Sequence, residues 1–215
     1  MEKYLWDKVF SSKNKGVKSS FFKSYESIVT SKEGLNNLYK IWNGDISITD
    51  IQLSINDFSN IALELSVKNY VNFPEILDTQ LESIKNTEKK ERFSFISNAI
   101  TNRDSFFESL MLEKNREKEP WVIDALSYLH HPLKSKESIK FIRPSLEIME
   151  ELQITGDIFF PQRWLDATFS GHSSIDAVTE INLFLNENPE FPENLKNKVL
   201  QSTDLVFRAS IIKNE

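Results

Sequence analysis

Apolar residues recur at the spacing of an α-helix along almost the whole chain. Val122, Leu126 and Leu129, for example, stand at positions i, i+4 and i+7, which places them on one helix face. Alternation typical of a strand is confined to short stretches, of which residues 46–51 are the best candidate. Only five glycines are present, too few for the turns of a β-sandwich or barrel of this size. The pattern predicts an all-α protein.

Capping and breaking residues divide this pattern into helices. Three pairs have the spacing of a capping box, in which a hydroxyl and a carboxylate satisfy first-turn N–H groups: Ser54 with Asp57, Thr101 with Asp104, and Ser173 with Asp176. Residues suited to first turns or to helix ends are Pro74, Pro120, Pro192, Gly44, Gly156, Gly171 and the pair His131-Pro132. The helices expected from these signals span residues 18–29, 32–43, 56–69, 74–86, 88–100, 103–116, 120–130, 136–155 with a break at Pro144, 159–169, 174–187 and 193–212.

Short connections between the expected helices favour antiparallel neighbours. A succession of such pairs stacks into a curved array, so the predicted architecture is an armadillo- or HEAT-like α-α superhelix. No fixed sequence period is present, which makes the repeats degenerate. Because composition does not shift along the chain, we expect one domain over residues 1–215.

Charge and composition argue against several classes of protein. The net charge is -6, whereas a nucleic-acid binder usually carries a basic surface. The lysine-rich stretch from Lys8 to Lys23 is typical of a solvated face, with an anionic partner as the alternative. Cysteine is absent, so disulfides and thiolate chemistry are excluded. The chain has no apolar run long enough to span a membrane and its first residues do not resemble a signal peptide, so we expect a soluble chain whose compartment stays open.

Motifs for catalysis are missing. The three histidines are His130, His131 and His172, and no H-E-x-x-H zinc motif occurs. Adjacent histidines on a helix point about 100° apart, so they do not readily share a metal ion. Neither a G-x-S-x-G nucleophile elbow nor a phosphate-binding glycine loop is present. We therefore predict no catalytic residue and no metal ligand, and a structural role for the histidines.

Two segments are dense in polar and aromatic residues. In the first, Arg116, Glu119, Trp121 and His131 stand near the start and end of one expected helix. This segment is either a hydrogen-bonded brace between helices or a surface that faces a substrate chamber or partner domain, where an arginine would bind carboxylates through its planar fork. The second contains Arg143 and, further on, the aromatic group Phe159, Phe160 and Trp164, which is typical of a core.

Several longer runs together resemble a known family. The runs NREKEPWVIDALSYLHHPL, IRPSLEIMEELQITGDIFFPQRWL and NLKNKVLQSTDLVFRA are similar to the C-terminal region of the aminopeptidase N family of zinc metallopeptidases, in particular a bacterial branch. The shorter runs LYKIWNG, DFSNIALELSV and RDSFFESL also resemble it. The likeness covers roughly residues 35–209 and is strongest from 102 to 170. Residues 1–30 match poorly and are read as a linker or branch-specific helix, which leaves 31–215 as the aminopeptidase-like part.

The resemblance implies a C-terminal helical domain that closes over a catalytic domain and lines the chamber for peptide substrates. Zinc and the G-x-M-E-N motif would belong to the catalytic domain, so the chain alone is not expected to be an enzyme and holds no cofactor. Its expected partners are the other domains of the parent aminopeptidase and peptides, with neither nucleic acid nor a membrane. The chamber-facing candidates are Asn115, Arg116, Glu119 and Arg143, and the brace candidates are Trp121, His131 and Trp164. Lys134 stands where the family pattern has arginine, which weakens a bidentate contact there.

Two other functions stay open at this point. A free-standing helical-repeat module that binds a protein would use the same curved surface, and an open groove in place of an apolar docking patch would distinguish it. An enzyme with an unrecognised site would need a concave pocket with convergent perturbed carboxylates or histidines.

Overall fold

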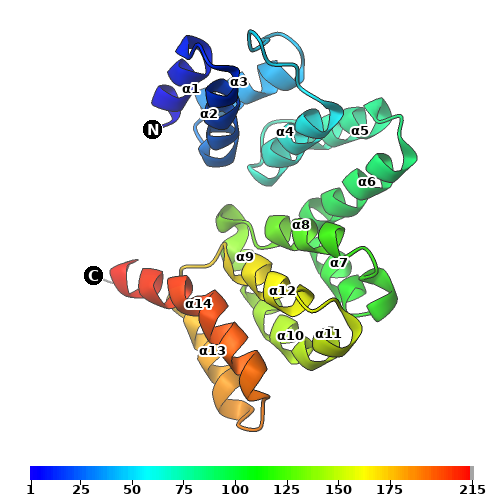
Figure 1. The fold of residues 1–215 in the computed structure, drawn as a ribbon, viewed down its shortest axis with the longest axis vertical. Coiled ribbons are helices and arrows are strands. Elements are labelled where there is room, and N and C mark those ends of the chain that lie inside the picture. The colour runs from blue at the N-terminus through cyan, green and yellow to red at the C-terminus, as the bar shows by residue number, and fades with distance from the viewer. Residues whose placement is uncertain (214–215) are drawn as a thin grey trace. The chain divides into compact units, whose positions relative to one another are not determined.

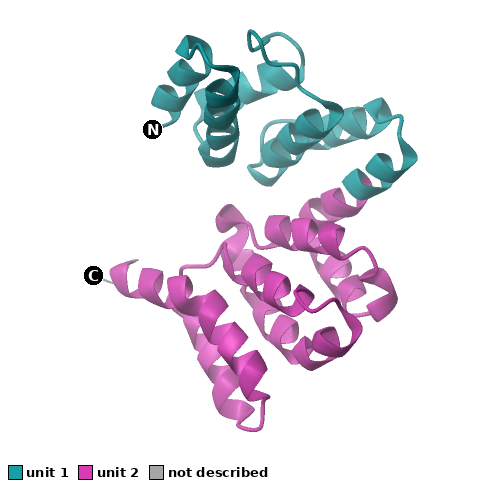
Figure 2. Ribbon diagram, viewed as in Figure 1, with its two compact units in different colours: residues 1–93 teal, residues 94–215 magenta. Residues whose placement is uncertain are grey.

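The computed structural model describes residues 1–213 and confirms the all-helical prediction, since none of these residues forms a strand (Figure 1). Residues 46–51, the candidate strand, form a turn and an irregular loop. The chain divides into two compact units, residues 1–93 and residues from 94 onward (Figure 2). The division falls inside a helix, and the expectation of one domain stays a prediction.

Unit 1 is built from packed helical hairpins. Its helices are α1 (Glu2–Ser11), α2 (Lys15–Ile28), α3 (Lys32–Trp42), α4 (Ile55–Val67), α5 (Phe73–Ser83) and the first part of α6 (Thr87–Thr101). Helix α1 packs on α2, while α4 packs on α2, α3 and α5. Helix α4 is the centre of this unit because apolar side chains on most of its faces, among them Ile61, Leu63 and Leu65, are buried.

Unit 2 is organised around α12. Its remaining elements are α7 (Arg103–Leu110), η1 (Glu113–Asn115), α8 (Glu119–Leu129), η2 (Pro132–Lys134), α9 (Ser135–Ser138), η3 (Ile139–Phe141), α10 (Ile142–Glu147), α11 (Met149–Thr155), α12 (Phe160–Phe169), α13 (Ile175–Glu187) and α14 (Glu193–Lys213). Helix α12 contacts α8, α10, α11 and α14. Phe160, Trp164 and Phe169 are its fully buried aromatic side chains, as expected for a helix surrounded by others.

Several sequence signals mark helix ends as predicted. Ser54 and Asp57 form a complete capping box at the start of α4. Pro74 and Pro120 lie in the first turns of α5 and α8, where a missing N–H costs no helix bond. Gly44 follows α3 with a φ of 86°, a conformation that glycine adopts without strain.

Other boundary predictions were wrong. Thr101 ends α6 instead of capping the next helix, because Asn102 stands at the N-cap of α7. The hydroxyl that caps α13 belongs to Ser174, one residue after Ser173. Pro144 does not break a helix. It is the third residue of α10, and the expected helix is interrupted instead by η3 (Ile139–Phe141) and at Ile148, between α10 and α11.

The first thirty residues carry one helix more than expected. They form two helices, α1 and α2, instead of one helix after a linker. Helix α1 is held by Leu5 and Val9, which are buried, and by Glu2, whose carboxylate accepts hydrogen bonds from the backbone N–H groups of Thr30 and Ser31.

Candidate functional site

The segment that leads into α8 is bonded to two other helices of unit 2, α7 and α11. Arg116 is 4% exposed, and its guanidinium donates to the carbonyl oxygen of Leu110 at 2.6 Å. The same side chain pairs with Glu151 of α11. Asn115 donates to the carbonyl oxygen of Ser109 at 2.8 Å. These contacts favour the brace interpretation for Arg116, because a guanidinium that faces inward offers little surface to a peptide.

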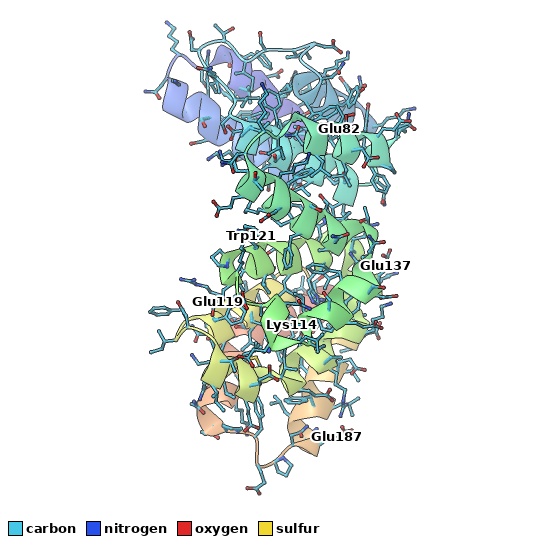
Figure 3. All side chains as sticks on the ribbon, turned by 90° about the vertical axis from the view of Figure 1, so that its right-hand side faces the viewer. Glu82, Lys114, Glu119, Trp121, Glu137 and Glu187 are labelled. Carbon is cyan, nitrogen blue, oxygen red and sulfur yellow. The ribbon has the colours of Figure 1, made fainter. Side chains whose placement is uncertain are left out.

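Glu119 fixes the turn between α11 and α12. Its Oε1 atom accepts a hydrogen bond from the backbone N–H of Asp157 at 2.8 Å. The Asp157 carboxylate in turn accepts from the N–H of Phe159 at 2.6 Å. Figure 3 labels Lys114, Glu119 and Trp121 in the part of the chain that enters α8. The turn is therefore held by one hydrogen bond to Glu119 of α8 and by a second hydrogen bond within the turn itself.

This turn and the last turn of α11 expose three large apolar side chains to solvent. Ile154, Ile158 and Phe159, which we name the apolar turn, are 83%, 81% and 60% exposed. The core prediction was therefore wrong for Phe159, which precedes the first turn of α12, whereas Phe160 and Trp164 are buried. Isolated exposed apolar residues are ordinary on protein surfaces, whereas three within six positions form a patch of the kind that marks interaction sites. Arg163 lies over the Phe159 ring with its guanidinium carbon 5.8 Å from the centroid.

A groove of about 440 Å³ runs beside the apolar turn. Ile158 and Pro161 form its apolar wall. Its polar lining includes Gln153 and Asn194, whose side chains are hydrogen-bonded to each other at 2.9 Å. Lys198 also lines the groove, so the groove combines an apolar wall with polar and cationic side chains.

Arg143 lies on the surface of α10, away from the segment before α8. It pairs with Glu147 at 3.2 Å and with Glu187 of α13, and these carboxylates raise its pKa. It is the most accessible of the arginines predicted to face a chamber, since about a third of its side chain is exposed. The chamber-facing role of Asn115, Arg116, Glu119 and Arg143 stays a prediction.

The brace candidates occupy three different environments. Trp121 packs beside Phe95 of α6. The Lys118 ammonium lies over the Trp121 ring, 3.8 Å from its centroid. Trp164 is fully buried in α12, as the sequence predicted for a core position. His131 caps the short η2 helix by accepting the N–H of Leu133 at its Nδ1 atom.

A buried histidine pair is the feature that sequence reasoning missed. His130 Nδ1 and His172 Nε2 lie 2.9 Å apart, which is hydrogen-bond distance. Their outer nitrogens, Nε2 of His130 and Nδ1 of His172, are buried without a partner in the described part of the chain. Burial lowers the pKa of His172 to about 4, and burial, His172 and Arg103 together hold the pKa of His130 well below its usual value.

The pair depends on a close backbone approach. A Cβ atom at Gly171 would lie 1.6 Å from the carbonyl oxygen of His130, so only glycine fits there. Gly171 was expected merely to end a helix. The two histidines lie 42 positions apart in sequence, so no local motif indicates their contact.

A second perturbed group lies in unit 1. Burial and the Glu64 carboxylate raise the pKa of Glu26 to about 8, although Lys68 acts in the opposite direction. Lys68 pairs with Glu64 at 2.7 Å and donates to the carbonyl oxygen of Glu26 at 2.5 Å. The Lys68 ammonium is thus shared between the Glu64 carboxylate and a backbone carbonyl oxygen in the last turn of α2.

Within residues 1–213, no group of three or more histidines, cysteines or carboxylates is placed to hold a metal ion. None of the described helices is long and apolar enough to cross a bilayer. No protein-family model, curated protein or solved structure matches this chain.

Proposed function

We propose that this chain is the non-catalytic C-terminal helical domain of a zinc aminopeptidase of the aminopeptidase N family. It would close over the catalytic domain and line the chamber that holds the peptide. Its helical hairpins would form an armadillo- or HEAT-like superhelix. Zinc would be bound by the catalytic domain of the parent protein, and peptides would be its substrates.

The apolar turn is the observation that carries this proposal. Ile154, Ile158 and Phe159 fall inside residues 102–170, where the resemblance to the family is strongest. Hydrogen bonds accepted by the Glu119 and Asp157 carboxylates hold the turn in place before any partner binds, which lowers the entropy cost of docking. A preformed exposed apolar patch supports docking against a catalytic domain better than it supports an isolated domain.

An activity assay on the complete gene product and on the 215-residue chain tests the proposal. With zinc present, the complete product should release amino acids from short peptides, whereas the 215-residue chain should not. Mixing the chain with the separately expressed remainder of the protein should restore or alter activity. Hydrolysis by the chain alone, or a complete gene product with no aminopeptidase activity, would overturn the proposal.

A variant in the apolar turn tests the docking surface. Ile158→Asp should weaken association with the remainder of the protein about tenfold or more, because a carboxylate would have to be desolvated in an apolar contact. Leu205→Asp is the matched control, since Leu205 is 75% exposed on α14 and lies outside the apolar turn. Equal affinities for the two variants would show that the turn is not the docking surface.

A free-standing helical-repeat module that binds a protein is the second candidate function. Two open pockets on unit 1, beside Tyr70, favour it. A gene product that ends where this chain ends and that shows no peptidase activity would select this alternative.

A further inference from the structure

The turn between α4 and α5 in unit 1 has an unusual backbone. Asn69 and Asn72 both have positive φ, at 54° and 59°, within four residues. Asparagine adopts this conformation more readily than most residues, so the two positions set a tight path for the turn. The N–H of Tyr70 donates to the carbonyl oxygen of Leu65 and that of Phe73 to the carbonyl oxygen of Tyr70, so the turn is internally fixed.

Tyr70 belongs to this turn, and its ring is one of three neighbouring aromatic rings, Tyr70, Tyr39 and Trp42, which we name the aromatic row. Its ring stacks on Tyr39 of α3 with centroids 5.2 Å apart and planes at 26°. The centroid of the Tyr39 ring lies 5.8 Å from that of the Trp42 ring. The Trp42 indole N–H donates to Gln80 of α5, which leaves only the ring face of Trp42 for other contacts. The row is rigid because both of its ends are anchored.

Two open pockets flank Tyr70, with volumes of about 820 and 320 Å³. Tyr70 and Val71 line both pockets, and Val71 is 72% exposed. Each pocket also contains two asparagines, Asn36 and Asn69 in the larger pocket and Asn43 and Asn72 in the smaller. The two pockets are thus adjacent, share one wall and repeat the same amide lining.

Two of these asparagines, Asn36 and Asn72, have side-chain donors to offer. The side-chain oxygen of Asn36 accepts a hydrogen bond from the Tyr70 hydroxyl at 3.2 Å. Within the described residues, the NH₂ group of Asn36 makes no hydrogen bond. Asn72 occupies the N-cap of α5 but makes no capping bond with its side chain, unlike a usual N-cap asparagine. A side-chain amide combines one acceptor with two donors and therefore complements a peptide group.

The lining also restricts the ligand. Apolar residues Leu35, Val71 and Ile76 favour apolar side chains over polyhydroxylated rings. Lys32 and Glu33 offset each other in the larger pocket and Glu75 lines the smaller one, so the site does not attract a polyanion. In an extended peptide, side chains i and i+2 lie on one side about 7 Å apart and can enter neighbouring pockets.

We propose that the two pockets bind an extended peptide segment that places apolar side chains i and i+2 on either side of Tyr70, with its backbone amides on Asn36 and Asn72. We name these pockets the Tyr70 site. The fixed turn makes the site preformed, which lowers the cost of ordering on binding. The proposal does not depend on the peptidase assignment, because it is argued from the lining of the two pockets alone.

Two capped peptides of the same composition test the spacing. Acetyl-Phe-Ser-Leu-amide places its apolar side chains at i and i+2, and acetyl-Phe-Leu-Ser-amide places them next to each other. Each is titrated into the ¹⁵N-labelled 215-residue chain, and the side-chain N–H signals of Asn36, Asn72 and Trp42 are followed by NMR. The first peptide should shift these signals and bind at least about tenfold more tightly, while the indole signal of Trp164 in unit 2 stays unchanged.

Variants separate the Tyr70 site from the rest of the surface. Val71→Asp should abolish the shifts without unfolding the chain, because Val71 is exposed, and Leu205→Asp is the matched control on unit 2. Asn72→Gly preserves the positive φ and removes the amide, so it should weaken binding several-fold while thermal stability is retained.

Three results would each overturn the proposal. The two peptides could bind equally well, Val71→Asp could bind like the unaltered chain, or neither peptide could shift the signals at millimolar concentration. A titration with chitotriose tests carbohydrate as the alternative ligand. Shifts at the Tyr70 site with chitotriose and none with the peptides would replace the peptide assignment.

Discussion

Acidification from pH 7.5 to 5.0 is expected to weaken unit 2 through its buried histidine pair. His172 is 5% exposed and contacts His130, which is fully buried, so a proton on either ring is poorly solvated. Its pKa is about 4 in the folded chain, against 6.5 for an ordinary histidine. Between these two values the unfolded chain binds a proton that the folded chain does not, so stability is complete above pH 6.5 and is lost as the pH falls.

The size of the effect follows from the pKa difference. At pH 5.0 the unfolded His172 is almost fully protonated and the folded His172 is almost fully neutral. The pH then lies about 1.5 units below the unfolded pKa, which corresponds to a loss of about 2 kcal/mol. His130 acts in the same direction, because its pKa is also lowered. The two rings together should make at least this contribution.

Urea unfolding of the unaltered chain and of His172→Gln, each at pH 5.0, 6.0 and 7.5, measures this contribution. The free energy of unfolding of the unaltered chain should fall by about 2 kcal/mol more than that of the variant. Other titrating groups, including Glu26, are common to both proteins and cancel in the difference. Parallel pH profiles, or an NMR titration in which the His172 ring protonates near pH 6.5, would refute the reasoning.

Three substitutions test other contacts. Arg116→Met should destabilise the chain by about 1–3 kcal/mol in urea unfolding, because a buried carbonyl oxygen loses its donor, whereas the exposed Arg208→Met control should cost less than about 0.5 kcal/mol. Glu26→Gln should gain about 3 kcal/mol of stability relative to the unaltered chain as the pH rises from 5 to 8, because the raised pKa of Glu26 makes ionisation costly in the folded state between pH 4.5 and about 8; a flat difference in stability would contradict this. Gly171→Ala should lower stability by about 3 kcal/mol in thermal unfolding because its methyl group would meet the His130 carbonyl, and a melting temperature close to that of the unaltered chain would contradict the close contact.

Local signals predicted the helices well because their causes are local. The capping box at Ser54 and the first-turn proline at Pro74 act within one helical turn, so spacing alone reveals them. Pro144 was misjudged because a proline breaks a helix or begins one according to where the preceding turn ends. Helix α1 was missed because it depends on tertiary contacts, among them the Glu2 carboxylate at the start of α3.

The sites could be predicted only in part, because they are made by residues far apart in sequence. Arg116 and Glu119 stood out as a polar cluster, but only the fold shows that they support the turn at Asp157. Tyr39 and Tyr70 belong to different helical hairpins, and no periodic pattern places one ring on the other. Long-range pairs of this kind follow from packing, and a single sequence carries no direct record of packing.

The position of the unit boundary inside α6 decides how this protein can be divided for experiment. A fragment that stops at residue 93 would end on the stub 87–93, less than two helical turns, with the buried Phe93 as its last residue. Isolated helices of that length are not stable in water. A fragment of unit 1 should therefore extend through Thr101, and a fragment of unit 2 should begin at Thr87, so that both retain the complete helix.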